Sequence, residues 1–409
     1  MKKYSLGKEQ IKVLLLEGVH ESALNLLHEN NYTNIECITS ALNKVELIEK
    51  IKDVHMIGIR SRTELTKDVL QHAAKLITIG CFSIGTNQVD KKTAKSLGIP
   101  VFNAPFSNTR SVAELVIAES IMLMRSVPKL NSNAHNGKWL KTAKDSHEVR
   151  GKTMGIVGYG HIGSQVSILA EAMGMKVYYF DIIKKLTLGN AIQCKTLEEV
   201  LNVSDVVTLH VPSTELTKDM IGAKEIAVMK RGSILINASR GDVVEYNAVA
   251  EALKTCHLLG VAADVFPDEP ASNNEPFKFI LQGMDNVILT PHVGGSTLEA
   301  QENIGIEVTE KMIQYSDIGA TLGSVNFPQI SLAPHKDLQR FLHIHQNQPG
   351  VMREVNGVFS KRGINIASVY LQTDPEIGYV IIDTESQLDD TILKELKEIE
   401  HTIKARMLY

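Results

Sequence analysis

The sequence predicts an α/β protein with two doubly wound parallel-sheet domains, followed by a small C-terminal domain of βαββαβ order. Short apolar runs alternate with amphipathic runs twice along the 409 residues, over residues 11–105 and again over 152–295. This alternation is typical of parallel sheets whose two faces are covered by helices. A third series, over residues 338–409, has the strand and helix order of a ferredoxin-like domain.

The first series contains four expected strands and ends in a long helix. The strands are KVLLLEG (12–18), MIGIRSR (56–62), LITIGCF (76–82) and IPVFNAP (99–105), with helix-like segments such as ESALNLLHEN (21–30) and KKTAKSLG (91–98) between them. Residues 107–127 then predict a long helix with an apolar face, for which Ser111 and Glu114 supply a capping box.

The second series contains six expected strands: TMGIVG (153–158), KVYYFD (176–181), VVTLHV (206–211), SILINAS (233–239), LLGVAAD (258–264) and NVILT (286–290). A second long helix follows at 296–316, with Ser296 and Glu299 as its capping box. Residues 319–337 are rich in Gly, Pro and Ser and lack periodicity, so we expect a linker at 327–337 before the last domain at 338–409.

The composition is that of an ordinary globular protein, with 44% hydrophobic and 22% charged residues and a formal net charge of −4. This balance gives no electrostatic basis for binding nucleic acid or an anionic membrane. No apolar stretch reaches the roughly 18 residues that a membrane span needs. The four cysteines are scattered without metal-ligand spacing, so we expect no metal site and a reducing, cytoplasmic setting.

A glycine-rich loop opens the second series. In GIVGYGHIG, residues Gly158, Gly160 and Gly163 follow a strand and begin a helix, and Asp181 ends the next strand 23 positions after Gly158. This is the dinucleotide pattern, in which the helix N-terminus binds the pyrophosphate and the acidic residue binds the ribose hydroxyls. Because Asp181 would repel a 2′-phosphate, the pattern favours NAD over NADP. A glycine-rich turn without a ligand is the alternative.

Arg240, Glu269 and His292 follow later strands of the same series, at the carboxyl ends where open α/β sheets bind ligands. Hydride transfer from an alcohol needs a base for the hydroxyl proton, which suits a histidine oriented by a carboxylate. A guanidinium can bind a substrate carboxylate through two parallel hydrogen bonds. Taken singly, each residue has a structural alternative. Arg240 could form a structural ion pair and His292 could be a loop histidine. Glu269 could be a solvated acid in a turn, and Asp264 could simply cap a strand. Only their combination beside a dinucleotide loop predicts an active site.

Several segments resemble the signatures of the D-isomer-specific 2-hydroxyacid dehydrogenases. They are GKTMGIVGYGHIG (151–163), INASRGDVV (236–244), DVFPDEP (264–270) and LTPHVGGST (289–297), with further matches in IGIRSRTELT (57–66), IGCFSIGTNQVD (79–90) and FNAPFSNTRSVAELV (102–116). The resemblance covers essentially the whole chain. It implies a discontinuous substrate-binding domain at 1–107 and 296–326 and an inserted NAD-binding Rossmann domain at 108–295.

The resemblance also implies a role for each candidate residue. His292 is expected to be the general acid/base, Glu269 its carboxylate partner and Arg240 the anchor of the substrate carboxylate. The residues expected to line NAD are Gly158, Gly160, His161, Ile162, Gly163, Asp181, Ala238, Ser239, Arg240, Asp264, His292, Gly294 and Gly295.

The activity implied by the resemblance is oxidation of 3-phospho-D-glycerate to 3-phosphohydroxypyruvate, the first step of L-serine biosynthesis, with 2-oxoglutarate as a candidate second substrate. Arg60 and Arg62 are expected to bind the phosphate, with Ser61, Asn108 and Lys141 as further substrate contacts. Close relatives carry a lysine where this sequence has Thr39, a departure that bears on phosphate affinity. Trp139 stands near Lys141 in a segment that relatives extend into a neighbouring subunit; packing within its own domain is the alternative.

The C-terminal domain resembles an ACT domain. His345, Asn347 and Asn365 match positions that hold L-serine as an effector, and the resemblance implies feedback inhibition within a homo-oligomer, a tetramer. Because His343 and His345 alternate along a strand, we expect only one of them to face a given site. The alternative is a domain that only joins subunits.

Two other functions stay open at this point. One is a different dehydrogenase of the family, acting on hydroxypyruvate, glyoxylate or lactate. The other is a NAD-sensing, corepressor-like binding protein.

Overall fold

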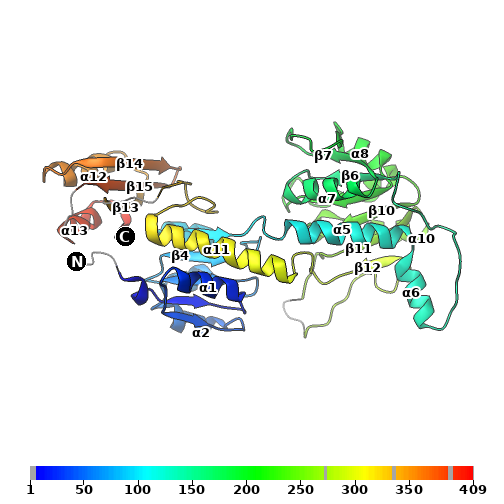
Figure 1. Ribbon diagram of the computed structural model, residues 1–409, viewed down its shortest axis with the longest axis horizontal. Helices are drawn as coiled ribbons and strands as arrows, with labels where there is room; N and C mark the ends of the chain where they lie inside the picture. The colour runs from blue at the N-terminus through cyan, green and yellow to red at the C-terminus, as the bar shows by residue number, and fades with distance from the viewer. Residues whose placement is uncertain (1–5, 271–273, 334–337, 386–389, 409) are drawn as a thin grey trace. The chain divides into compact units, whose positions relative to one another are not determined.

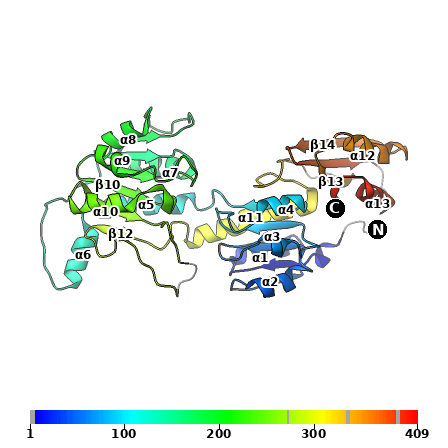
Figure 2. The same ribbon diagram turned by 180° about the vertical axis from the view of Figure 1, so that it is seen from behind.

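A computed structural model describes residues 6–270, 274–333, 338–385 and 390–408. The chain forms two compact units, shown in Figure 1 and from behind in Figure 2. Unit 1 comprises residues 1–107 and 301–409, and unit 2 comprises residues 108–300. Each unit is described by itself.

Unit 1 begins with a five-stranded parallel sheet of order β2-β1-β3-β4-β5. The strands are β1 (Val13–Leu15), β2 (Ile35–Cys37), β3 (Met56–Ile59), β4 (Thr78–Cys81) and β5 (Val101–Asn103). This is the flavodoxin-like order of a doubly wound sheet. The sequence prediction missed β2, because this edge strand of three residues is only partly buried and lacks a continuous apolar run.

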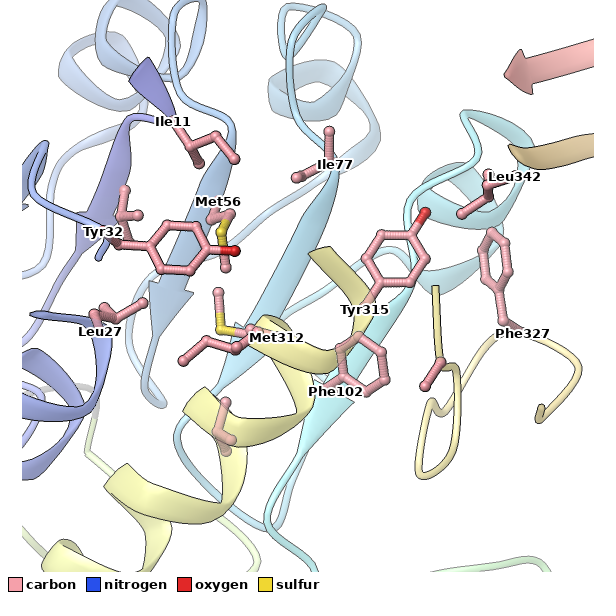
Figure 3. Packing of buried hydrophobic residues seen from close by; sticks show 14 of the residues in the cluster. Ile11, Leu27, Tyr32, Met56, Ile77, Phe102, Met312, Tyr315, Phe327 and Leu342 are labelled. Atoms are coloured by element: carbon pink, nitrogen blue, oxygen red, sulfur yellow. The ribbon is translucent and has the colours of Figure 1, made fainter. Parts of the chain in front are cut away.

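Helices cover both faces of this sheet. They are α1 (Glu21–Glu29), α2 (Lys44–Ile51), α3 (Lys67–Leu70), α4 (Lys91–Ser96) and α11 (Leu298–Ile318), most of which belongs to unit 1. Apolar residues of α1 and α11 pack on one face and those of α2, α3 and α4 on the other. Figure 3 shows Met312 and Tyr315 of α11 among the strand residues Met56 and Phe102.

Unit 1 also contains a four-stranded antiparallel sheet of order β14-β15-β13-β16. Its elements are β13 (Gln339–Gln346), α12 (Val351–Ser360), β14 (Ile366–Thr373), β15 (Ile377–Thr384), α13 (Asp390–Glu398) and β16 (Thr402–Met407). The two faces differ: Phe341 and Val380 pack with α12 and α13, whereas Leu342 and Tyr379 join the core that includes α11.

The segment expected to be a linker is partly packed. Phe327, Ile330 and Leu332 are buried in the core that contains α11, and the rest of the expected linker, residues 334–337, lies outside the described residues. The same core contains Tyr379 of β15, whose ring lies 5.9 Å from that of Phe327, so this connection packs against both parts of unit 1.

Unit 2 contains a seven-stranded parallel sheet of order β12-β11-β10-β9-β6-β7-β8. The strands are β6 (Thr153–Val157), β7 (Lys176–Phe180), β8 (Ile192–Gln193), β9 (Val206–Leu209), β10 (Ser233–Asn237), β11 (Leu258–Ala263) and β12 (Val287–Leu289). Counted within the domain this is the Rossmann order 3-2-1-4-5-6, extended by one strand. The predicted fold class is confirmed for all three sheets.

The helices of unit 2 divide between the faces of its sheet. They are α5 (Thr109–Met124), α6 (Val127–His135), α7 (His161–Ala172), α8 (Leu197–Val203), α9 (Ala223–Val228) and α10 (Tyr246–Lys254). Apolar residues of α5 and α7 pack on one face, and those of α8, α9 and α10 pack on the other. The carboxyl ends of β6, β10 and β11 therefore open onto a single edge that the helices leave uncovered.

Both predicted capping boxes are wrong. The N-cap of helix α5 is Asn108, three residues before the predicted cap Ser111, and the Ser111 hydroxyl hydrogen-bonds that of Thr297 at 2.8 Å. Helix α11 is capped by Thr297, whose hydroxyl accepts from the Ala300 amide at 3.1 Å. Each predicted box had the Ser-x-x-Glu spacing of a capping box, but in the folded loops another residue caps the helix.

Two features are absent from the part of the chain that the structure describes. No described helix is long and apolar enough to cross a membrane. No group of three or more His, Cys, Asp or Glu side chains among the described residues could hold a metal ion.

Candidate active site

The glycine loop between β6 and α7 has the geometry that a dinucleotide pyrophosphate requires. Gly158 has a φ of +93°, and a Cβ there would collide with the carbonyl oxygen of His210. A Cβ on Gly163 would collide with the Gly158 carbonyl, so this glycine permits close packing of helix on strand. A Cβ on Gly160 would meet no atom within 4 Å, so its backbone is open to a ligand at the start of α7. These residues fit NAD.

Asp181 lies directly after β7 beside this loop. Its Oδ2 accepts from the Tyr159 amide and its Oδ1 from the Ile183 amide, each at 2.9 Å. The carboxylate is therefore fixed in place as an acceptor for ribose hydroxyls, while its negative charge disfavours a 2′-phosphate.

Replacement of Asp181 by Ser is expected to weaken NADH binding by about 10- to 100-fold, because a hydrogen bond to a charged group contributes roughly 1.5–3 kcal/mol. Affinity for NADPH relative to NADH should rise in the same variant. Fluorescence titration with both dinucleotides measures this, with Asp285→Asn, which removes an exposed carboxylate elsewhere in unit 2, as the control. An unchanged preference would exclude Asp181 from the ribose site.

His292 and Glu269 form a hydrogen-bonded pair past the ends of β12 and β11. His292 Nδ1 lies 2.8 Å from Glu269 Oε2, and Glu269 Oε1 accepts from the Phe266 amide at 3.1 Å. His292 has a φ of +54°, a left-handed conformation that the surrounding loop must hold. With Nδ1 bonded to the carboxylate, Nε2 is the nitrogen left to exchange a proton with a substrate.

The pair shifts both pKa values in the direction that catalysis needs. The hydrogen bond that His292 donates to Glu269 raises the pKa of His292 above its usual value, against the opposing effect of burial. Burial also opposes ionisation of Glu269, but the hydrogen bond and charge of His292 outweigh it and lower the pKa of Glu269. The carboxylate therefore stays ionised and stabilises a protonated imidazole.

Arg240 follows β10 on a turn that Asn237 organises. Asn237 Nδ2 donates to the Arg240 carbonyl at 2.9 Å, and its Oδ1 accepts from the Ser239 amide at 3.1 Å. The guanidinium donates to the Ser239 carbonyl at 2.6 Å and forms no ion pair with a described carboxylate. The structural ion pair considered above is therefore not found among the described residues, and the guanidinium can bind an external anion.

Asp264 fixes the loop that carries His292. Its Oδ1 accepts from the Thr290 hydroxyl at 2.6 Å and the Val293 amide at 2.8 Å, and its Oδ2 accepts from the Gly294 amide at 2.8 Å. The side chain is 2% exposed. A Cβ on Gly295 would collide with the side chain of Asn108. Asp264 thus acts in this structure as a positioning residue for the histidine loop.

Glu269 and His292 line a cavity of about 450 Å³ within unit 2. Phe266, Phe277 and Leu289 contribute apolar walls to it. The side chains of His292 and Glu269 are 51% and 36% exposed, so the pair is accessible to a substrate.

The pH dependence of activity tests the role of Glu269. Reduction of an oxo acid requires protonated His292 and is lost as pH rises through its pKa, which the carboxylate holds above the usual value. In Glu269→Gln this loss should move to lower pH, and activity at neutral pH should fall by about tenfold or more. Asp268→Asn, which changes the adjacent exposed acid, should leave the profile unchanged. Identical profiles for both variants would contradict the pairing.

The phosphate-binding candidates lie on a loop after β3 that Glu17 shapes. The Glu17 carboxylate accepts from the backbone amides of Arg60, Arg62 and Thr63 at 2.8–3.1 Å. Ser61 and Arg62 are exposed and Arg60 is half-buried. The sequence prediction missed Glu17, because the sequence shows only an acidic residue after the first strand and nothing that links it to the arginine loop. The exposed Thr39 has its backbone beside Gly18, the residue that follows Glu17.

Trp139 and Lys141 lie in an exposed segment of unit 2 that the structure leaves without packing partners. Trp139 is 89% exposed, and Lys141 is exposed as well. Packing of the tryptophan against its own domain, the alternative considered above, is therefore not observed.

One chain does not bring the three effector candidates together. Asn347 donates to the Asp374 carbonyl at 2.8 Å, at the turn between β14 and β15. Asn365 donates to Glu385 at 3.1 Å, at the opposite end of the same two strands. Eight strand residues at about 3.3 Å each separate the two ends by roughly 25 Å.

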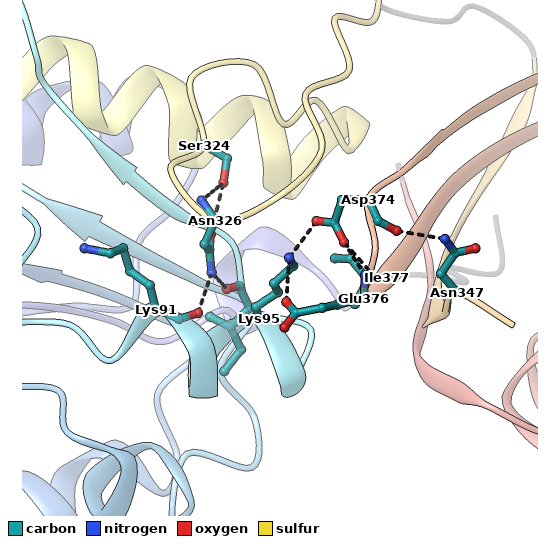
Figure 4. Close-up of polar contacts among 9 residues, drawn as sticks. Lys91, Lys95, Ser324, Asn326, Asn347, Asp374, Glu376 and Ile377 are labelled. Carbon is teal, nitrogen blue, oxygen red and sulfur yellow. Dashed lines mark hydrogen bonds and ion pairs between the residues drawn. The ribbon is translucent and has the colours of Figure 1, made fainter.

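The turn near Asn347 also contacts the first sheet's domain (Figure 4). Lys95 of α4 pairs with Asp374 at 2.6 Å and with Glu376 at 2.7 Å. The Asn347 backbone amide donates to the Glu376 carbonyl at 2.9 Å. An effector candidate and an interdomain ion pair therefore share one turn within unit 1.

The expectation that only one of His343 and His345 faces a given site is wrong. Residues two apart on a strand point to the same face, and their Nδ1 atoms lie 3.3 Å apart. Thr402 donates its hydroxyl proton to Leu396 and so accepts from His343 Nε2. His343 Nδ1 then accepts from His345, which leaves His345 Nε2 unprotonated and lying against Gly378, where a Cβ would collide with it. Burial lowers both pKa values, that of His343 to about 4, so both rings are neutral.

Residues 117–294 match the family model described as D-isomer specific 2-hydroxyacid dehydrogenase, NAD binding domain. Residues 341–404 match that of the AHAS small subunit-like ACT domain. The solved D-lactate dehydrogenase of Aquifex aeolicus, complexed with NAD and lactic acid, is similar over 78% of this chain and 100% of its own, with 27% identity and a TM-score of 0.67.

The chain therefore belongs to the family of D-isomer specific 2-hydroxyacid dehydrogenases, and the resemblance that its motifs indicated is confirmed. Its similar relatives include the D-3-phosphoglycerate dehydrogenases of Haemophilus influenzae, 58% identical over 100% of this chain and 99% of the relative, and of Escherichia coli K12, 57% identical over the full length of both.

Proposed function

We propose that the protein is a NAD-dependent dehydrogenase that oxidises 3-phospho-D-glycerate to 3-phosphohydroxypyruvate, in the cytoplasm, where its four free cysteines would stay reduced. The observation that carries the proposal is the His292–Glu269 pair in the same domain as the Arg240 guanidinium and the open glycine loop. Full-length relatives named for this activity add support.

Each residue has one task in the reaction. Arg240 binds the C1 carboxylate and fixes the orientation of C2. His292 Nε2 accepts the hydroxyl proton as the carbonyl forms, and Glu269 stabilises the resulting imidazolium. NAD, when bound by the glycine loop and Asp181, supplies the acceptor for the hydride.

The phosphate group of the substrate, its second anionic group beside the C1 carboxylate, would determine which 2-hydroxy acid the enzyme prefers. We propose that Arg60 and Arg62 bind its phosphate, with Ser61, Asn108 and Lys141 as further polar contacts. Thr39 adds no charge where relatives carry lysine, so the two arginines must supply most of the attraction. The same cations favour 2-oxoglutarate, which carries a second carboxylate, as an additional substrate.

Steady-state rates with 3-phosphohydroxypyruvate and with hydroxypyruvate test this specificity. We expect kcat/KM to favour the phosphorylated acid by about 100-fold or more, because hydrogen bonds to a charged group contribute roughly 1.5–3 kcal/mol each. Equal values would favour a hydroxypyruvate or glyoxylate dehydrogenase. No NADH oxidation with any 2-oxo acid would favour the NAD-sensing binding protein.

We propose that the protein is a homotetramer in which β14 pairs with β14 of a second copy. β14 is an edge strand, and its Val369, Tyr370 and Leu371 are 40–42% exposed. Exposed apolar edge strands are sites of strand pairing. Antiparallel pairing about a two-fold axis places Asn365 of the partner subunit near the turn that holds Asn347. The exposed Trp139 segment offers a second contact surface, as a tetramer with two-fold axes needs.

The same pairing would complete an effector site for L-serine. Amide groups of Asn347 and of the partner's Asn365 offer donors and acceptors for its carboxylate and hydroxyl, and His345 Nε2 offers an acceptor for its ammonium group. Feedback inhibition then requires that serine bind two states of the enzyme unequally.

The replacement Leu371→Glu tests the pairing, because it places like charges across the two-fold axis. We expect the mass measured by light scattering to halve and calorimetric serine binding to fall at least tenfold. Leu216→Glu, at a position 83% exposed in unit 2, is the control. An unchanged mass and serine affinity would contradict the pairing, whereas activity that ignores serine would remove only the regulatory proposal.

A further inference from the structure

A cavity of about 380 Å³ in unit 1 has a strongly positive lining. It lies where β16 and α13 meet the segment that follows α3, and no residue assigned above to catalysis or effector binding lines it. Four of its nine lining residues, Lys75, Lys397, Lys404 and Arg406, are cationic, and none is acidic. A smaller cavity of about 160 Å³ adjoins it, sharing Lys397 and Arg406 and adding His55.

Most of these cations lack an acidic partner among the described residues. Only Lys75 forms an ion pair, with Asp53 at 2.6 Å, and both side chains are more than half exposed. Lys404 donates to the Leu76 carbonyl at 2.7 Å, and Arg406 Nη2 donates to the Ser316 carbonyl at 3.4 Å. Arg406 Nη1 is buried with no hydrogen-bond partner. The guanidinium also lies 5.7 Å from the centre of the Tyr315 ring, so the cavity is lined by the rest of the Arg406 side chain and by its charge at short range.

The positive charges also oppose one another. Burial, with the charge of Arg406 added, lowers the pKa of Lys404 to about 7. Burial lowers the pKa of His55 as well, and the charges of Lys75 and Arg406 add to the effect. A site built this way gains free energy when an anion enters, because the anion relieves the repulsion.

We infer that this cavity binds a small dianion, a phosphate ester or a dicarboxylate, at a site separate from the active site. Lys75 belongs to the domain of the first sheet, whereas Lys397, Lys404 and Arg406 belong to the C-terminal domain. A dianion bound by both sets of cations stabilises the contact between these two parts of unit 1.

Equilibrium dialysis of the intact protein against radiolabelled inorganic phosphate, repeated with succinate, tests the inference. The Arg60→Gln/Arg62→Gln variant is used throughout, so that phosphate held by the proposed active site does not contribute. We expect one bound anion per chain, and at least tenfold weaker binding in the added Lys397→Gln/Lys404→Gln variant. The tighter of the two probes identifies the chemical class.

The controls keep the test independent of folding and of the proposed activity. Lys394→Gln changes an exposed lysine on the same helix α13 that does not line the cavity, and should bind the anion normally. Lys397→Gln alone changes an exposed side chain and should still weaken binding if the double variant unfolds. The inference would be overturned if neither phosphate nor succinate bound, or if the Lys397→Gln and Lys394→Gln variants bound the anion equally well. Neither outcome would affect the proposed dehydrogenase activity.

Discussion

Replacement of His292 by Asn is expected to lower kcat by about 10²- to 10⁴-fold, the range that a general acid/base contributes. The hydrogen bond between Nδ1 and Glu269 leaves Nε2 as the nitrogen that exchanges the substrate proton. Asparagine cannot perform this exchange at neutral pH. Because the glycine loop and Asp181 are unchanged, NADH affinity measured by fluorescence should fall far less than kcat does.

A matched control separates catalysis from general damage to the fold. His135→Asn changes an exposed histidine at the end of α6 in the same unit and should retain full activity. The remaining activity of His292→Asn should also lose the pH dependence that Glu269→Gln shifts. A fall of less than about threefold in kcat would assign the proton transfer to another group.

Replacement of Arg240 by Gln is expected to lower kcat/KM by about 10²- to 10⁴-fold, because two hydrogen bonds to the substrate carboxylate are lost and each contributes roughly 1.5–3 kcal/mol. The kcat/KM of Arg240→Lys should lie between those of Arg240→Gln and of the unsubstituted protein, because lysine keeps the positive charge but lacks the planar pair of donors. Single-turnover kinetics with saturating NADH would separate binding from chemistry.

Arg231→Gln is the control for this substitution. Arg231 precedes β10 and is exposed at the opposite end of the strand from Arg240, where it donates to the Thr255 carbonyl at 3.2 Å. If Arg240→Gln bound and turned over the acid as well as Arg231→Gln does, Arg240 would not be the residue that binds the substrate carboxylate.

The fold was predictable because strands buried on both faces read as continuous apolar runs between amphipathic helices. Strand β2, with Glu36 at its centre, and the two-residue β8 lie at sheet edges and carry no such run. The capping boxes failed for a different reason. Ser111 and Ser296 have the right spacing, but a hydroxyl chooses its partner from contacts that form only in the folded loop.

Much of the candidate site was also predictable, because acids, histidines and arginines at carboxyl strand ends must gather at one edge of a parallel sheet. The supporting network was not. Glu17 holds the Arg60–Arg62 loop through three backbone amides, and Asn237 fixes the Arg240 turn, yet both read in the sequence as ordinary polar residues. The separation of Asn347 from Asn365 depends on strand register, which the residues alone leave open.

Deuterium transfer measures hydride exchange between C2 of the phosphorylated acid and the dinucleotide. The purified protein is incubated with 3-phosphohydroxypyruvate and NADH carrying deuterium on either face of C4, and the product is examined by mass spectrometry and NMR. We expect 3-phospho-D-glycerate with deuterium at C2 from one of the two labelled forms. A product without deuterium from either form, or no product at all, would contradict the proposed reaction.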